Sequence, residues 1–217
     1  MTIVYLWRVQ GFGILRAIHQ MGFARFFLKF TPGVRFSKSI GTGTGKRFTP
    51  SDANPFLWGL IVVVDDPVRF DNSKVVRQWR RFAVAEKRYL LHPLSSHGQW
   101  AGKEPFIIDG TVQGDGKIAA ITRARIAWRK NFLFWSAVPP VTKSLHEQPG
   151  LEMAIGIGEA PIGLQGTFSL WKDAKSLRDF AYKGEAHAGA IEATQRHRWY
   201  SEELFARFAV LEERGSI

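Results

Sequence analysis

Apolar and polar positions alternate along the first segment of the chain and then change to a helical spacing. TIVYLWRV (2–9) alternates in the way that is typical of a β-strand. From 14 to 27 the apolar residues recur at helical spacing, which predicts an α-helix. The alternating VRFSKSI and the apolar run FLWGLIVVVDD predict two further strands. A second helix is predicted over 74–86, because its apolar residues gather on one side.

The same order of elements recurs in the second half of the chain. KIAAITRARIAW predicts a strand, and 130–145 predicts a helix that two prolines bend or interrupt. LEMAIGIGEAP and GTFSLW predict strands, helical segments are expected from 173 to about 194, and ARFAVLEE predicts a closing strand. Between the halves, prolines and glycines predict a long connection. We therefore expect a first repeat (1–92), a connecting loop (93–116) and a second repeat (117–217).

This repeated order predicts the fold class. Strand, helix, two strands and helix make up a ferredoxin-like αβ unit, whose sheet is covered by helices on one face only. Two such units in one chain can bury the other faces by packing sheet to sheet or by closing into a barrel. We predict an α+β fold of two fused ferredoxin-like repeats that form an α+β barrel, of the dimeric α+β barrel type, within one chain.

The glycine-rich segment GTGTGKRF (41–48) resembles a phosphate-binding loop but lacks its spacing. Such a loop needs glycine, four residues and then Gly-Lys-Ser/Thr, whereas Ile40 and Arg47 occupy the two ends here. The dinucleotide fingerprint fails as well, because the third glycine is misplaced and no helical pattern follows. Gly41-Thr42-Gly43 instead matches Gly156-Ile157-Gly158 in the second half. Both segments are predicted to be strand-to-strand turns with positive φ.

Composition and charge narrow the classes of function. The 217 residues are 45% hydrophobic, which supports a sizeable core and excludes a disordered chain. Because the chain has no cysteine, disulfides, thiolate ligation of a metal or haem and a cysteine nucleophile are excluded. The net charge of +11 comes from scattered cations without a nucleic-acid motif, so no nucleic-acid partner is expected. A solvated basic face, an anionic membrane surface or a ligand with carboxylates fits this charge.

Two of the six histidines are candidate ligands of a metal. His187 lies in YKGEAHAGAIEATQ, where Ala190 and Ile191 share its helical face and small residues would let a flat macrocycle approach. His19 lies in the apolar helix 14–27 and stays an alternative to His187. For either histidine, a core or interface position without a ligand is the competing interpretation. No histidine spacing typical of zinc occurs.

Other residue types give weaker indications of chemistry. Trp171 and Phe168 belong to an unusually aromatic second half, which forms core or lines a pocket for a flat or long apolar ligand. Asp66 and Asp173 are interpreted as helix caps rather than as catalytic acids. A Gly-x-Ser-x-Gly motif is absent from the sequence, so a serine triad has no support.

Five segments together resemble a known family: SIGTGTGKRFTP, GKEPF, ITRARIAWRKNFLFW, GIGEAPIGLQGTFSLW and WYSEELFARF. They resemble the spheroidene monooxygenases, a family of carotenoid-modifying enzymes, over nearly the whole chain and most densely from 118 to 208. The resemblance implies a ferredoxin-like α+β barrel, a b-type haem and O₂-dependent oxygenation of acyclic carotenoids such as spheroidene near the chain end. The fold is also similar to haem-binding aldoxime dehydratases. A histidine on a helix of their C-terminal half ligates the iron, which implies that His187 is the axial ligand here.

The resemblance gives the other candidates a role as well. Arg123 and Arg125 lie two apart on one predicted strand, so both point to one face of it. If that face lines the pocket, one of them is expected to bind a haem propionate or the oxygen that the haem activates; otherwise the face is solvent-exposed. Trp171, Phe168, Ala190 and Ile191 are expected around the haem.

The sequence thus predicts a haem-dependent monooxygenase with a hydrophobic substrate, O₂ and an electron donor such as ferredoxin as partners. Two alternatives stay open: a haem-dependent dehydratase of an aldoxime-type substrate, and a non-catalytic barrel that binds haem or another ligand. No signal peptide and no bilayer-spanning apolar run is recognisable, so a cytoplasmic location is expected, with peripheral membrane contact through the positive face. The oligomeric state stays open, a homo-oligomer included.

Overall fold

The structure, a computed structural model, describes residues 1–46, 52–126, 145–159, 166–183 and 200–217. Its first half comprises β1 (Thr2–Arg8), α1 (Gly13–Lys29), β2 (Val34–Gly43), β3 (Ala53–Val64), α2 (Pro67–Asp71), α3 (Lys74–Arg80) and β4 (Ala85–Gly98). Its second half comprises β5 (Ile118–Ile126), β6 (Leu151–Gly158), β7 (Gly166–Trp171), α5 (Ala174–Lys183) and β8 (Tyr200–Ser216). The helix expected over 130–145 lies, except for Leu145, outside the described residues.

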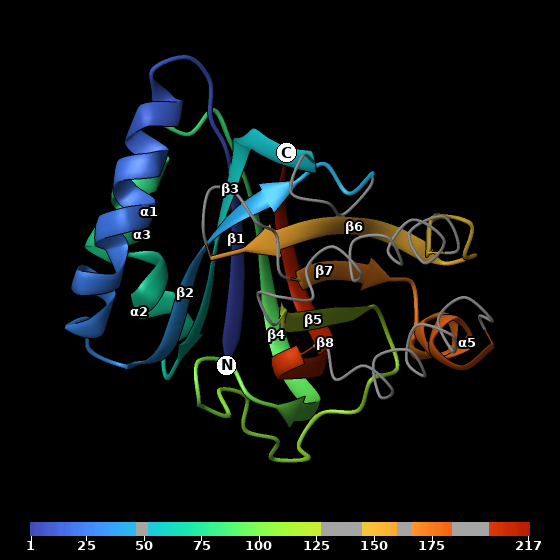
Figure 1. The fold of residues 1–217 in the computed structure, drawn as a ribbon. Helices are drawn as coiled ribbons and strands as arrows, with labels where there is room; N and C mark the ends of the chain where they lie inside the picture. Colours follow the sequence, from blue (N-terminus) through green and yellow to red (C-terminus); the bar gives the residue numbers. More distant parts are fainter. Residues whose placement is uncertain (47–51, 127–144, 160–165, 184–199) are drawn as a thin grey trace.

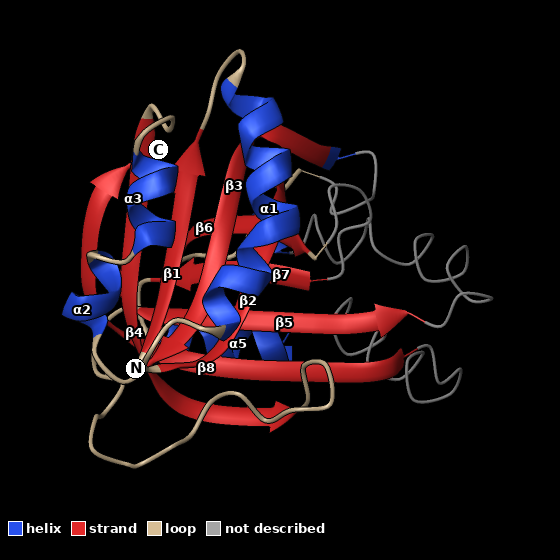
Figure 2. Cartoon of the chain, turned by 90° about the vertical axis from the view of Figure 1, so that its left-hand side faces the viewer, coloured by secondary structure: helices blue, strands red, loops and turns tan. Residues whose placement is uncertain are grey.

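The strands close into one barrel, with the helices on its outside (Figures 1 and 2). Its strand order is β1-β3-β2-β6-β7-β5-β8-β4, and all neighbouring strands are antiparallel. The two halves of the chain meet at two seams, β2 with β6 and β4 with β8. The predicted α+β barrel of two ferredoxin-like halves is therefore confirmed.

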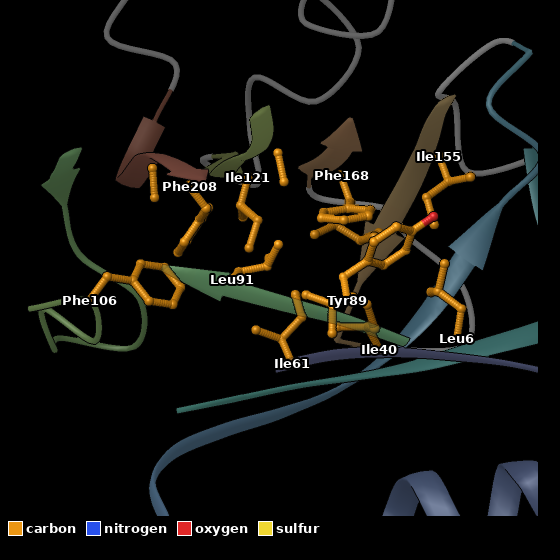
Figure 3. Close-up of a cluster of buried hydrophobic side chains, with 14 of the residues drawn as sticks. Leu6, Ile40, Ile61, Tyr89, Leu91, Phe106, Ile121, Ile155, Phe168 and Phe208 are labelled. Carbon is orange, nitrogen blue, oxygen red and sulfur yellow. The ribbon is translucent and has the colours of Figure 1, made fainter. Parts of the chain in front are cut away.

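Alternating side chains of the strands build separate cores on the two faces of the barrel wall. On β1, Val4 and Leu6 point into the barrel, whereas Tyr5 and Trp7 point outward beneath the helices of the first half. Because both faces of β1 are covered, this strand is apolar at nearly every position, and the alternation expected for it is wrong although the strand is confirmed. Apolar side chains from both halves fill the barrel interior (Figure 3), among them Ile40, Ile61, Leu91, Ile121, Ile155, Phe168 and Phe208.

Helices cover the outer faces of the two halves. Helices α1 and α3 pack on the first half, where Trp7 stacks on Trp79 with 4.8 Å between the ring centroids. Helix α5 packs on the second half, where Trp171 and Phe180 lie 5.4 Å apart. As predicted, Asp66 caps α2 by accepting a hydrogen bond from the backbone N–H of Arg69. Among the described residues, no helix combines the length and the apolar character needed to cross a membrane.

The two glycine segments lie in strands, so the prediction of turns is wrong. They form the last residues of β2 and β6, where Gly41 pairs with Gly158 and Thr42 with Ile157. Their glycines have extended strand backbone without positive φ. The segments are equivalent because they join the two halves at one seam. Positive φ occurs a little later, at Gly45 (+79°), where an added Cβ would collide with the backbone of Ala154.

Two element boundaries also differ from the predictions. The helix expected over 74–86 ends at Arg80, because the backbone N–H of Val84 donates to the carbonyl of Arg8 and leads the chain into β4. Strand β4 continues to Gly98, so the connection spans 99–117 rather than 93–116. A register shift beside Pro93 lets the β4–β8 ladder accommodate a residue without an N–H. The division into repeats of 1–92 and 117–217 stays a prediction.

Candidate functional site

Charged side chains from both halves of the chain meet beside the apolar interior of the barrel. Lys38 on β2, Arg123 on β5 and Glu202 on β8 each lie two residues from a core residue that points into the barrel. Because side chains two apart on a strand share a face, these three also point inward. Glu159 directly follows β6 and continues its inward-facing row. The core residues that fix these phases are Phe36, Ile40, Ile121, Ile155, Ile157 and Leu204. We call Lys38, Arg123, Glu159 and Glu202 the charged cluster.

Arg123 is the centre of this cluster, and only 2% of its side chain is exposed. Its Nη2 donates to Glu159 at 2.9 Å, and its Nη1 donates to Glu202. The guanidinium also lies 5.4 Å from the ring centroid of Trp100, whose Nε1 donates to Glu159 at 2.8 Å. The Nζ of Lys38 donates to the other carboxylate oxygen of Glu159 at 2.5 Å. The cluster thereby connects β2, β5 and β8 with Glu159 after β6, and through Trp100 it also contacts the segment after β4.

Both carboxylates of the charged cluster are held in the ionised form. Burial raises the pKa of Glu202, but the backbone N–H groups of Gly102 and Ala101 and the guanidinium of Arg123 outweigh burial and lower the pKa to about 2. Burial likewise raises the pKa of Glu159, and its three donors lower it below the usual range. Two cations therefore balance two carboxylates, and neither carboxylate carries a proton to donate near neutral pH.

One donor of the cluster has no partner among the described residues. The Nε of Arg123 is buried and makes no hydrogen bond there. An unsatisfied buried N–H is costly, so an oxygen atom of a ligand or of water would be stabilised beside it. Because both Nη atoms already bind carboxylates, a further carboxylate could bind Arg123 through Nε alone.

Arg125 differs from Arg123 although both belong to one face of β5. It lies two residues further along the strand, opposite Glu202 in the register with β8, and its side chain is exposed. The two arginines therefore share a face of β5, as expected, but Arg123 is enclosed by the barrel whereas Arg125 extends into solvent.

Phe168 and Trp171 lie on opposite faces of β7. Phe168 is fully buried inside the barrel, with its ring centroid 5.5 Å from that of Tyr89. Trp171 is fully buried outside the barrel wall, where it packs on Phe180 and its Nε1 donates to Ser169 at 2.9 Å. One flat ligand on one face of the sheet can therefore contact only one of them, and their expected role beside a cofactor stays a prediction.

The outer face of the second half carries a row of small side chains beyond Trp171. In the register of the strands, Ser169 of β7 lies between Ala154 of β6 and Ala120 of β5. Two residues away on each strand, Thr167 of β7 likewise lies between Gly156 of β6 and Thr122 of β5, and all three face outward. The corresponding face of the first half bears Tyr5, Trp7 and Trp58 instead. We call the six residues Ala120, Thr122, Ala154, Gly156, Thr167 and Ser169 the small-residue face.

The candidate metal ligands receive different outcomes. His187, Ala190 and Ile191 lie outside the described residues, so their roles stay predictions. His19 is exposed on α1 and stacks on Phe23 at 4.5 Å, on the outside of the barrel (Figure 2). Within the described ranges, no three His, Asp or Glu side chains gather in a way that could hold a metal ion. The structure therefore gives His19 no pocket of its own.

A cleft of about 460 Å³ lies beside the N-terminus. Arg35, which lines it, forms an ion pair with Asp65 at 2.5 Å, and a ring nitrogen of His92 shares a hydrogen bond with Asp109 at 2.9 Å. The Met1 amino group donates to the carbonyl of Val64 at 3.0 Å. The buried hydroxyl of Thr2, which also lines the cleft, has no hydrogen-bond partner among the described residues, but it is a neutral group, so we do not assign the cleft to a charged ligand.

Sequence reasoning did not find Lys38, Glu159 and Glu202 as members of the site. The sequence does contain an indication of the site, because these charged residues occupy positions of the alternating pattern that are otherwise apolar. In VRFSKSI, Lys38 stands between Phe36 and Ile40, both of which are core residues. A single strand does not reveal which charges meet, since the partners come from strands that only the closed barrel brings together.

Comparison with known proteins reveals close relatives, although no family model matches the chain. The spheroidene monooxygenase of Rhodobacter capsulatus is 36% identical over 218 residues, with 97% of this chain and 90% of that protein covered. The spheroidene monooxygenases of Cereibacter sphaeroides and Rubrivivax gelatinosus are each 34% identical. These two alignments cover 91% and 89% of this chain, and 62% and 77% of the respective relatives.

Solved structures resemble this chain at much lower identity. An aldoxime dehydratase in complex with butyraldoxime is 12% identical, with a TM-score of 0.53 over 97% of this chain and 79% of its own. A putative monooxygenase from Fusobacterium nucleatum is 11% identical, with a TM-score of 0.44 over 99% of this chain and 94% of its own. At such identities the first likeness concerns the fold alone, and it agrees with the barrel described above.

Proposed function

This chain belongs to the spheroidene monooxygenase family, and we propose that it is a haem-dependent monooxygenase of an acyclic carotenoid such as spheroidene. The observation that carries the proposal is the 36% identity to a spheroidene monooxygenase along 97% of the chain. Oxygenase activity is what the members of the family share by name. The haem, the carotenoid and the position of attack are the finer parts of the proposal.

The small-residue face supports a flat cofactor on the outside of the second half. The two repeats have the same strand order, yet one outer face bears stacked aromatic rings and the other bears alanine, glycine, serine and threonine. Side chains of this size allow a planar group to lie close to the sheet. By contrast, the described interior of the barrel is filled by packed apolar side chains. These residues fit a haem on the outer face of β5, β6 and β7.

His187 is the residue that we propose as the axial ligand of this haem. It belongs to the segment of the sequence between α5 and β8, and α5 packs on the outer face of the second half. A neutral imidazole is a common proximal ligand of haem iron, and the chain has no cysteine to take that place. Ala190 and Ile191, three and four positions further along the sequence, are proposed to lie beside the macrocycle.

The haem would supply the activation of O₂. In the net reaction one oxygen atom enters a C–H bond of the carotenoid to give an alcohol, and the other leaves as water with two electrons and two protons. We propose that a one-electron carrier such as reduced ferredoxin supplies the electrons. A second insertion at the same carbon, followed by loss of water, would give a ketone.

Arg123 is proposed to hold its surroundings in place rather than to transfer protons. A guanidinium stays protonated at physiological pH, and both Nη atoms of Arg123 bind ionised carboxylates. Its Nε is the atom through which it would donate to an oxygen of a water inside the barrel. Arg125 continues this face of β5 beyond the cluster, which is the face opposite to the small-residue face, so its expected role at a haem propionate stays a prediction.

The visible absorption spectrum of the purified protein tests the proposal. Protein from haem-replete cells should show a Soret band, and the substitution His187→Ala should abolish it while leaving the far-UV circular dichroism unchanged. His19→Ala is the matched control and should keep the band. A colourless wild-type protein, or full haem content in the His187 variant, would reject the assignment.

Turnover separates the alternatives that the fold leaves open. A monooxygenase consumes O₂ and reductant with a carotenoid, whereas an aldoxime dehydratase would turn over an aldoxime without O₂. Stoichiometric haem without consumption of either substrate would indicate a haem carrier instead.

A further inference from the structure

Helix α1 turns its large apolar side chains away from the barrel. The residues that pack against the strands are Ala17, Gln20, Met21, Ala24 and Leu28. Seven apolar residues in and beside the helix are 45–85% exposed: Phe12, Leu15, Ile18, Phe23, Phe26, Phe27 and Phe30. The apolar periodicity that predicts this helix therefore describes mainly its outer face.

The spacing of these residues produces a continuous stripe. With 3.6 residues per turn, positions 12, 15, 19, 23, 26 and 30 share one side of the helix, opposite the buried positions 17, 21, 24 and 28. His19 lies within this stripe and stacks on Phe23. Figures 1 and 2 place α1 at the outer edge of the molecule, on the side away from β5 and β7. A soluble protein rarely exposes such a contiguous apolar surface without a partner for it.

Cations border the stripe on both sides. Arg16 flanks one side of it, and Arg25 and Lys29 flank the other. The guanidinium of Arg25 lies 4.7 Å from the ring centroid of Phe26, and the Nζ of Lys74 on α3 lies 5.6 Å from that of Phe27. Residues 1–51 contain eight lysines and arginines but neither aspartate nor glutamate. Of these, Arg16, Arg25 and Lys29 lie on α1 itself, so the apolar stripe and its bordering cations belong to the same helix.

We propose that this face docks onto an anionic lipid bilayer, with α1 lying in the plane of the interface. The phenylalanines would enter the boundary between headgroups and acyl chains. Arg16, Arg25 and Lys29 would extend along that boundary so that their charged ends contact lipid phosphates. An exposed apolar stripe bordered by cations is the arrangement that such binding requires.

A second copy of the chain fits this surface less well. A two-fold dimer would bring the same face of both copies together, so the bordering cations of α1 would face one another without carboxylates between them. A bilayer rich in acidic lipids supplies the opposite charge and the apolar medium at once. The docking goes beyond the proposed function, because it requires neither haem nor carotenoid.

Co-sedimentation with vesicles tests this proposal on the full chain. Wild-type protein should bind vesicles of phosphatidylglycerol and phosphatidylcholine, and binding should weaken severalfold between about 0.05 M and about 0.5 M salt, as screening of surface charges predicts. The triple substitution Phe23→Ser, Phe26→Ser and Phe30→Ser should lower the partition coefficient at least about tenfold. The matched control is Phe205→Ser, which removes an exposed phenylalanine of β8 and should leave binding unchanged.

Circular dichroism of each variant establishes that it is folded, and analytical ultracentrifugation gives its oligomeric state. Wild-type protein that fails to bind acidic vesicles, or a folded triple variant that binds as well as wild type, would overturn the proposal. So would a wild-type dimer that the triple substitution converts to a monomer without any vesicle binding, since the stripe would then be a contact between copies. Because empty vesicles suffice, failure here leaves the proposed oxygenase activity untouched.

Discussion

Arg123 donates a hydrogen bond to Glu202 inside the barrel, although 79 positions separate the two residues along the chain. The same guanidinium binds Glu159 after β6 and faces the ring of Trp100 after β4. One nearly inaccessible cation thus links segments that close the second half of the barrel with a segment of the first.

The first prediction concerns the loss of this cation. Arg123→Met should lower the free energy of unfolding by about 3 kcal/mol, because removing the buried guanidinium leaves two partly buried carboxylates without the cation between them. Urea unfolding followed by circular dichroism measures this change. Arg125→Met, on the same strand but exposed, should cost about 0.5 kcal/mol or less. Equal losses for the two variants would contradict the central place of Arg123.

The second prediction concerns pH. The folded state lowers the pKa of Glu202 from its ordinary 4.5 to about 2, so its contribution to stability is fully present above pH 4.5 and disappears as the pH falls toward 2. Glu202→Gln should therefore be less stable than wild type at pH 7, and the difference should shrink steadily below pH 4.5. Unfolding curves between pH 7 and pH 3 measure it. A difference that is independent of pH would show that ionisation of Glu202 does not stabilise the fold.

The third prediction concerns the small-residue face. Thr122→Phe places a large ring on this face at a position that is exposed, so the barrel should fold while haem content falls severalfold. The ratio of Soret to protein absorbance measures the loss. Val68→Phe, at an exposed position of α2, is the matched control and should load haem like wild type. Full loading of the Thr122 variant would exclude a cofactor on this part of the sheet.

The fourth prediction concerns the seam between β2 and β6. Gly45 has a φ of +79°, and a Cβ there would collide with the carbonyl of Ala154. Gly45→Ala should therefore cost at least about 1–3 kcal/mol of stability. Gly116→Ala is the control, because no atom lies within 4 Å of its added Cβ and its φ is not positive. Similar thermal midpoints for the two variants would contradict the close approach at the seam.

The fold was largely predictable because the alternation of apolar residues reports directly on strands. The repetition of elements after residue 116 indicated two ferredoxin-like halves, and the barrel follows from their need to bury a second face. The glycine segments were misinterpreted for a physical reason. Glycine suits both a turn and the close pairing of Gly41 with Gly158, and local sequence does not distinguish the two.

The candidate site was less predictable than the fold. Arg123 was identified from its place on a strand, yet its carboxylate partners lie on segments distant in sequence, and only closure of the barrel brings them together. Helix α1 shows the opposite difficulty. Its apolar spacing predicted a helix correctly. Because the helix is apolar nearly all round, however, the spacing does not reveal which of its sides packs against the barrel.

The most direct test of the proposed function follows the oxygen atoms. Purified, haem-loaded protein is supplied with an acyclic carotenoid such as spheroidene, reduced ferredoxin and ¹⁸O₂, and the products are analysed by mass spectrometry. The account predicts an oxygenated carotenoid that carries one ¹⁸O atom per hydroxylation, with no product under anaerobic conditions. An unlabelled product, or unchanged carotenoid while the haem remains bound and reduced, would contradict it.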